Sequence, residues 1–163
     1  MTLTRQQPGT LILGIGNPLL GDDGLGMRAV EILAECELPA QVSVMQAGTP
    51  GWGLPTWLEG WSQVILIDAV HMGEAPGTWR RFGLQDARLI AQDEVISLHE
   101  PGLANGLELA QALDILPEEI LIYGVEPGHY EPGQQLSPAV TLALPKLVDA
   151  ILSDLWNGRT KHG

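Results

Sequence analysis

The sequence predicts a three-layer α/β sandwich, in which helices cover both faces of a mostly parallel, twisted sheet of about five strands. Short apolar runs alternate with amphipathic stretches along all 163 residues. The run from Val64 to Ile67 is apolar at every position, as is typical of a parallel strand buried on both faces. No repeat or linker interrupts the pattern. We therefore expect one domain over residues 1–163, with an ordered core at about 9–156 and a short flexible tail.

Five segments have the composition of strands. Four of them are rich in apolar and β-branched residues, and they span 10–15, 41–46, 64–70 and 119–125. The fifth, 78–82 (TWRRF), has two arginines between aromatic residues. We expect it at an edge of the sheet, where an antiparallel strand is readily accommodated.

Amphipathic segments between these strands predict the helices. The first helix follows Asp22-Asp23, and its apolar face comprises Leu25, Ala29, Ile32, Leu33 and Cys36. The second begins at Pro101, a residue that suits a first helical turn. The third begins at Ser137-Pro138 and ends at Asn157-Gly158, with a possible kink at Pro145.

Composition excludes several classes of protein. The 20 acidic residues outnumber the 8 basic ones, and the net charge of −12 argues against nucleic acid and anionic membranes as partners. No apolar run approaches the length of about 18 residues that indicates a membrane span. The start, MTLTRQQPGT, lacks the layout of a signal peptide, so we expect a cytoplasmic location. The single cysteine, Cys36, excludes an internal disulfide.

The segment LILGIGNPLLGDDGLG resembles the phosphate loop that joins a strand to a helix. Gly14 and Gly16 match two glycines of a dinucleotide fingerprint, but the third position holds a leucine. Asp22 and Asp23 would repel a pyrophosphate where helix amides attract it, so the pair suits a cation better. One aspartate can cap the helix that follows. We assign that role to Asp22 and expect Asp23 to be a ligand.

Other polar residues also follow predicted strands, at the edge where ligands bind in such sheets. Asp68 lies near the end of an apolar strand, and an ionised side chain there is costly unless it is paired, caps a turn or binds metal. His99 precedes the helix at Pro101 and could instead bond only to the backbone. Two carboxylates and an imidazole suit a divalent metal such as zinc or nickel. Asp23, Asp68 and His99 are therefore the candidate metal ligands and catalytic residues.

Further candidates surround this trio. The turn at Gly48-Thr49 would let a substrate backbone approach closely, and with Asn17 it forms a candidate substrate loop. Glu126 either shapes a turn or acts in proton transfer. His71 either joins the site or faces water, whereas His129, in a loop rich in glycine and proline, is expected to be solvated.

In their order and rough spacing, five motifs resemble the [NiFe]-hydrogenase maturation endopeptidases. They are LGIGNPLLGDDGLG, QAGTPG, LIDAV, ISLHEPGLA and YGVEP, and the resemblance spans about residues 11–155. It implies removal of a C-terminal extension from a hydrogenase large-subunit precursor after nickel insertion, with nickel already held by the substrate. By motif, it places the metal contacts at Asp23, Asp68 and His99. Two positions depart from the family pattern: Asp23 often is glutamate, and Gln46-Ala47 replaces Asp-Gly.

The functional hypothesis is therefore an endopeptidase in which Asp23, Asp68 and His99 complete the coordination of a nickel ion carried by the substrate. Zinc or a similar divalent ion could occupy the same site. Asp22 or Glu126 would accept a proton. The expected partner is the large-subunit precursor, contacted by a monomer. The alternatives are a non-catalytic nickel-handling protein and a phospho-receiver domain, although Glu126 stands where a receiver needs a lysine.

Overall fold

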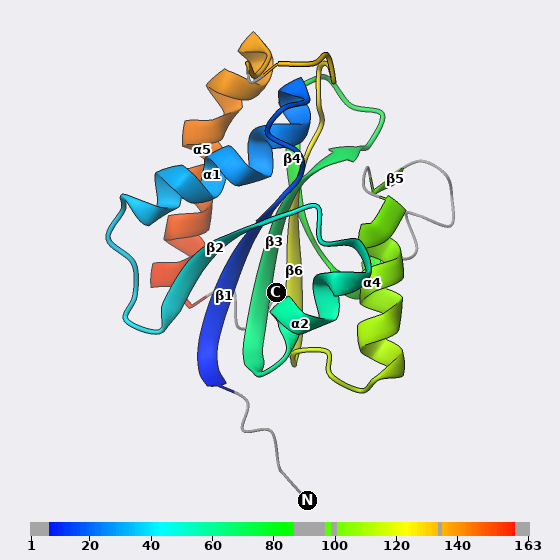
Figure 1. Cartoon of the computed structure of the whole chain (residues 1–163). Coiled ribbons are helices and arrows are strands. Elements are labelled where there is room, and N and C mark those ends of the chain that lie inside the picture. The colour runs from blue at the N-terminus through cyan, green and yellow to red at the C-terminus, as the bar shows by residue number, and fades with distance from the viewer. Residues whose placement is uncertain (1–6, 87–96, 99–100, 134, 159–163) are drawn as a thin grey trace, which may run out of the picture.

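The computed structural model describes residues 7–86, 97–98, 101–133 and 135–158. Five strands form the body of one sheet in the order β2-β1-β3-β6-β4 (Figure 1). In that order they span Val42–Gly48, Gln7–Ile15, Trp61–His71, Glu119–Val125 and Trp79–Gly83. All neighbours are parallel except β4, which lies antiparallel to β6 at one edge. The predicted sheet and the edge position of the arginine-containing strand are confirmed. The short β5 (Ser97–Leu98) pairs antiparallel with the end of β3.

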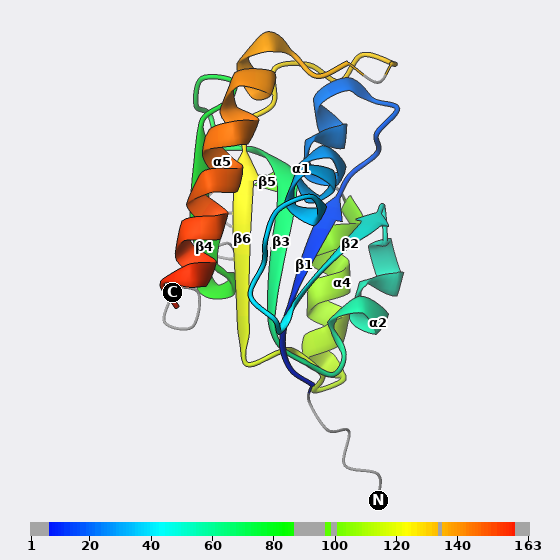
Figure 2. The same ribbon diagram turned by 90° about the vertical axis from the view of Figure 1, so that its left-hand side faces the viewer.

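Helices cover both faces of the sheet (Figure 1, Figure 2). One face carries α1 (Leu25–Ala34) and α5 (Pro138–Trp156), and the other carries α2 (Leu54–Leu58) and α4 (Pro101–Ala112). Alternate strand residues divide between two buried clusters, so that Leu11 and Leu13 face α2 and α4 while Ile12 faces α1 and α5. This arrangement is the predicted three-layer sandwich. None of the helices in the described ranges has the length and apolar character that crossing a membrane requires.

Helices α4 and α5 begin where the sequence signals place them, and one further helix is an exception to the predicted set. Ser137 is the N-cap of α5, since its hydroxyl accepts a hydrogen bond from the Val140 N–H at 3.4 Å, and Pro138 occupies the first turn. Helix α5 continues through the exposed Pro145. The exception is α2 with the preceding 3-10 turn η2 (Gly51–Gly53), where we expected a turn alone. A helix of five residues is too short to show a helical period in its sequence.

Glycines let α1 lie directly on the sheet. A Cβ atom added to Gly26 would come within 2.2 Å of the Ile67 carbonyl oxygen and 2.5 Å of the Ile15 carbonyl oxygen. One added to Gly14 would come within 2.3 Å of the Gly26 carbonyl oxygen. Gly14, one of the two glycines that match a nucleotide fingerprint, therefore serves the contact between helix and sheet. This contact fixes the Asp22-Asp23 pair at the carboxyl ends of β1 and β3.

Candidate active site

Strand β3 carries Asp68 into the interior. The side chain is 0% exposed, and its Oδ1 accepts a hydrogen bond from the adjacent Ala69 N–H at 2.8 Å. Asp68 lies on the same face of the sheet as Leu66 and Val70, because alternate residues of a strand share a face. Leu66 and Val70 belong to the buried cluster beneath α2 and α4. The strand continues beyond Asp68 to His71, so the aspartate lies near its end, as the sequence predicted. Asp68 is thus a fully buried carboxylate near the carboxyl edge of the sheet.

The loop after β1 folds back to hold Asp23, which is 1% exposed. Asp23 Oδ2 accepts a hydrogen bond from the Asn17 N–H at 2.8 Å. The Asn17 side chain is engaged locally, because its Oδ1 accepts from the Leu19 N–H at 2.9 Å and shapes the turn. Gly16, at φ +128°, permits the close packing, since a Cβ there would lie 1.9 Å from the Asp23 carbonyl oxygen. Both the backbone and the carboxylate of Asp23 are therefore fixed beside the end of β1.

Asp22 does not cap the helix that follows it, and that prediction is wrong. The N-cap of α1 is Gly24, and no side chain caps it. The Asp22 carboxylate instead accepts three backbone N–H bonds, at 2.6 Å from Gly128, 3.1 Å from His129 and 2.7 Å from Ser137. Burial by itself would raise the pKa of Asp22, but the hydrogen bonds from Ser137, Gly128 and His129 outweigh it and hold the pKa below its ordinary value.

Backbone hydrogen bonds join the loop after β1 to the loop after β6, at the upper end of the sheet in Figure 1. The Gly21 N–H donates to the Gly133 carbonyl at 2.9 Å, and the Gly133 N–H donates to the Leu19 carbonyl at 2.8 Å. The Asp22 N–H donates to the His129 carbonyl at 3.0 Å. His129 is half-buried with a buried Nδ1, so the expectation of a solvated side chain is wrong. These bonds hold the loop after β1 and the loop after β6 together along one side of the site.

The Glu126 side chain has a structural role at the same edge of the sheet. Its Oε2 accepts from the Met72 N–H at 2.7 Å, and its Oε1 accepts from the Glu74 N–H at 3.1 Å. Its own N–H donates to the Thr78 carbonyl at 2.8 Å. The buried side chain therefore secures the connection between β3 and β4. This is the turn-shaping alternative that the sequence left open.

Tyr130 is a residue of this edge that the sequence did not reveal. Its hydroxyl oxygen is buried, and its ring meets the exposed His71 edge-on, with 5.3 Å between ring centroids and 78° between planes. Burial raises the pKa of Tyr130 well above its ordinary value, and four carboxylates raise it further. They belong to Asp23, Asp68, Glu126 and Asp22. The phenol is therefore neutral at physiological pH.

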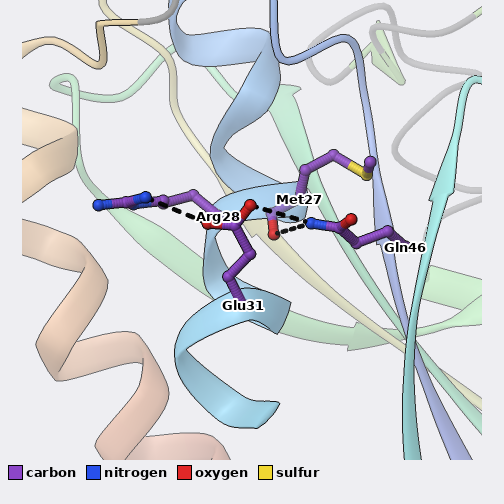
Figure 3. Close-up of polar contacts among 4 residues, drawn as sticks. All are labelled: Met27, Arg28, Glu31 and Gln46. Carbon is purple, nitrogen blue, oxygen red and sulfur yellow. Dashed lines mark hydrogen bonds and ion pairs between the residues drawn. The ribbon is translucent and has the colours of Figure 1, made fainter. Parts of the chain in front are cut away.

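The end of β2 lies against α1. Gly48, at φ +63°, accepts a bond from the Gly16 N–H at 2.8 Å, and the exposed Thr49 follows it. Gln46 is tied to α1, because its Nε2 donates at 3.2 Å both to the Met27 carbonyl and to Glu31 Oε1 (Figure 3). Glu31 also pairs with Arg28 at 3.1 Å in the same view. Gln46 thus fastens β2 to the helix.

The donor chemistry of the site suits a divalent cation in part. Asp23 and Asp68 supply two buried carboxylates, which are ordinary ligands for such ions. His99, the third predicted ligand, lies outside the described residues. Within the described part of the chain, no group of three histidine, cysteine, aspartate or glutamate side chains could hold a metal ion.

Comparison with known proteins identifies the family. A family model described as hydrogenase maturation protease matches residues 27–154. The chain belongs to the hydrogenase maturation protease family. This maturation protease is 35% identical over 165 residues to the hydrogenase expression/formation protein HupM of Azotobacter chroococcum, covering 90% of this chain and 75% of that protein. It is 37% identical over 132 residues to HupD of Rhodobacter capsulatus, covering 80% and 63%.

Solved structures agree with this assignment. The hydrogenase maturating endopeptidase HybD from E. coli matches with a TM-score of 0.80 and 30% identity, covering 92% of this chain and 93% of that one. The [NiFe] hydrogenase maturation protease HybD from Thermococcus kodakarensis matches with a TM-score of 0.75 and 29% identity, covering 90% and 99%. The resemblance inferred from the motifs is confirmed, and the family assignment replaces the receiver-domain alternative.

Proposed function

We propose that this maturation protease removes the C-terminal extension of a [NiFe]-hydrogenase large-subunit precursor after nickel has been inserted. Family membership supports the reaction and the partner. The observation that carries the proposal for the site is the burial of both Asp23 and Asp68 at the carboxyl edge of the sheet. Such carboxylates are well suited to a cation that arrives with a protein substrate.

The proposed metal is nickel held by the precursor, so it is part of the substrate rather than a resident cofactor. Asp23, Asp68 and His99 would complete its coordination, and zinc or a similar divalent ion could occupy the same position. The ion would position the scissile peptide and polarise its carbonyl or a bound water. A carboxylate beside a divalent cation is strongly acidic, which favours ligation over proton abstraction.

The other predicted residues receive supporting roles in this proposal. Both oxygens of Asp22 and both oxygens of Glu126 accept backbone N–H bonds. We therefore assign these two residues to building the site rather than to proton transfer. Asn17 shapes the turn that holds Asp23, whereas Gly48 with the exposed Thr49 remains the proposed substrate loop.

We further propose that the protease acts as a monomer in the cytoplasm, without nucleic acid or membrane partners. The net charge of −12 supports the absence of polyanionic partners. Light scattering on the purified chain tests the monomer, and fractionation of cells that express it tests the location.

The proposed function is tested by incubating the purified chain with nickel-loaded precursor and, in parallel, with nickel-free precursor. Intact-mass spectrometry should show loss of a C-terminal peptide from the nickel-loaded form alone. A stable complex with unchanged precursor mass would instead support the non-catalytic nickel-handling alternative. Equal cleavage of both forms would disprove recognition through nickel.

A further inference from the structure

Strand β2 is an edge of the sheet that lacks the usual protection. Among the described strands it pairs with β1 alone. An open edge presents N–H and C=O groups to which another chain can pair, and proteins commonly protect such edges with charged residues or proline. At the opposite edge, β4 carries Arg80 and Arg81, which pair with Glu74 and Asp154. The β2 sequence, VSVMQAG, has neither a charge nor a proline. The β2 edge is therefore suited to accept a further strand.

Backbone groups in the middle of β2 point away from the sheet. The Gln41 carbonyl accepts a hydrogen bond from the Thr10 N–H at 3.0 Å, which sets the ladder between β1 and β2. Alternate residues of a parallel ladder bond to the same neighbour, so the backbone groups of Ser43 and Met45 face β1. The N–H and C=O of Val44 consequently face outward. Val44 thus presents one donor and one acceptor to an added strand.

A groove of about 600 Å³ lies between this edge and α1. Strand β2 contributes Val44, Met45 and Gln46 to its lining, and Glu31 and Glu35 of α1 lie opposite them. Both Met45 and Gln46 are exposed. The volume is within the range of clefts that bind ligands in proteins. There is therefore room for a peptide beside β2.

The carboxyl end of β2 is fixed beside the candidate site. Gln46 Nε2 donates to the Met27 carbonyl (Figure 3), and the Gly48 N–H donates to Met27 Sδ at 3.4 Å. The Gly48 carbonyl accepts from the Gly16 N–H, and Gly16 packs directly against the backbone of Asp23. A peptide that lies along β2 therefore leads to the buried carboxylates.

We propose that the open edge of β2 binds the C-terminal extension of the precursor as an added antiparallel strand. This inference rests on the function proposed above. Pairing of an extended peptide with a sheet edge gives affinity through main-chain hydrogen bonds. It deepens the proposed function by assigning a place on the protease to the segment that is removed.

The direction of β2 decides which part of the precursor lies there. The strand runs from Val42 to Gly48, toward the site. A peptide that crosses the site and pairs antiparallel with β2 places the residues after the scissile bond along the strand. Parallel pairing would place the preceding residues there, and it is slightly less stable per residue. The residues after the scissile bond are the extension, whose free end allows it to lie along the groove.

Val44→Pro tests the proposal because it removes the outward N–H, and proline is tolerated at an edge position whose N–H faces solvent. The matched control is Val44→Ala, which keeps the N–H and removes side-chain contacts with the cluster beneath α1 and α5. Urea unfolding establishes that each variant is folded, and light scattering gives its oligomeric state. For the wild type and both variants, kcat and KM are measured on nickel-loaded precursor. The measurements are repeated on precursors whose extension is shortened stepwise from its C-terminus.

The KM of Val44→Pro should exceed that of Val44→Ala about 3- to 10-fold at similar kcat, as expected for one lost backbone hydrogen bond in substrate binding. Shortening the extension should raise the KM of the wild type more than that of Val44→Pro. Equal KM values in the two variants would overturn the inference. A wild-type KM that is constant at every length of extension would also overturn it, and this result needs no variant to fold.

Two further outcomes have separate meanings. A wild-type dimer that Val44→Pro converts to a monomer would assign the edge to a second copy of the chain and overturn the inference. Failure of the wild type to cleave the full-length, nickel-loaded precursor would overturn the proposed function, and the inference with it.

Discussion

Asp22→Asn should lower the free energy of unfolding by about 2–4 kcal/mol. The wild-type carboxylate accepts N–H bonds from Gly128, His129 and Ser137, at 2.6, 3.1 and 2.7 Å. Asparagine keeps one acceptor oxygen and places an NH₂ group against at least one of these buried donors. An unsatisfied buried donor costs about 1–3 kcal/mol, and the bonds that survive lose their charge assistance.

The effect should depend on pH in a defined direction. Burial opposes ionisation of Asp22, but its hydrogen bonds prevail, and the pKa in the folded state lies below the ordinary value. A depressed pKa contributes stability above the unfolded-state pKa of about 3.9, and this stability is lost as the pH falls through the folded-state pKa. The difference in the free energy of unfolding between wild type and Asp22→Asn should therefore be largest at neutral pH and become smaller below about pH 4.

Urea unfolding followed by circular dichroism at several pH values measures both effects. The control is Asp149→Asn, the same chemical change at an exposed position of α5, where we expect a shift within about 0.5 kcal/mol. The reasoning is refuted if Asp22→Asn shifts the midpoint no more than the control does. It is also refuted if the difference from wild type widens as the solution is acidified.

Three further substitutions, with Gly53→Ala as the control for the first of them, test the structure around the site. Gly26→Ala should cost about 3 kcal/mol in urea unfolding, because the new Cβ would lie 2.2 Å from the Ile67 carbonyl oxygen. Gly53→Ala, where no atom lies within 4 Å, should stay within about 0.5 kcal/mol. Glu126→Gln should cost about 1–3 kcal/mol and speed hydrogen exchange at Met72 or Glu74, since one of these amides loses its acceptor. Unchanged exchange at both amides would contradict that role. Ser137→Ala should cost about 1 kcal/mol in thermal unfolding through loss of the α5 N-cap, and no change would show that the cap is dispensable.

Most of the fold could be predicted because it depends on local patterns. Strand β3 is apolar at successive positions, which requires cover on both faces, and the arginines of β4 exclude a central position. Helix α2 could not be predicted, since five residues flanked by glycines give a turn-like composition. The pattern also did not show how closely α1 approaches the sheet, because that contact joins Gly26 to residues far along the chain.

The site was predictable only where it depends on strand ends. Asp23 follows β1, and Asp68 lies near the end of β3. Parallel strands bring such residues to one edge of the sheet. Asp22 was misassigned because its hydrogen-bond partners lie 106 to 115 residues away in sequence. Tyr130 was missed because the hydrogen bonds between the loop after β1 and the loop after β6 leave no periodic pattern in the sequence.

The most direct test of the proposed metal site is the rate at which folded Asp23→Asn, Asp68→Asn and His99→Ala variants cleave nickel-loaded precursor. Asp149→Asn serves as the control for a carboxylate lost elsewhere. Removing a ligand should forfeit several kcal/mol of transition-state stabilisation, so we predict rates at least about 100-fold below wild type, with a normal rate for the control. Near-normal rates in all three ligand variants would contradict the assignment of this edge as the metal-contacting site.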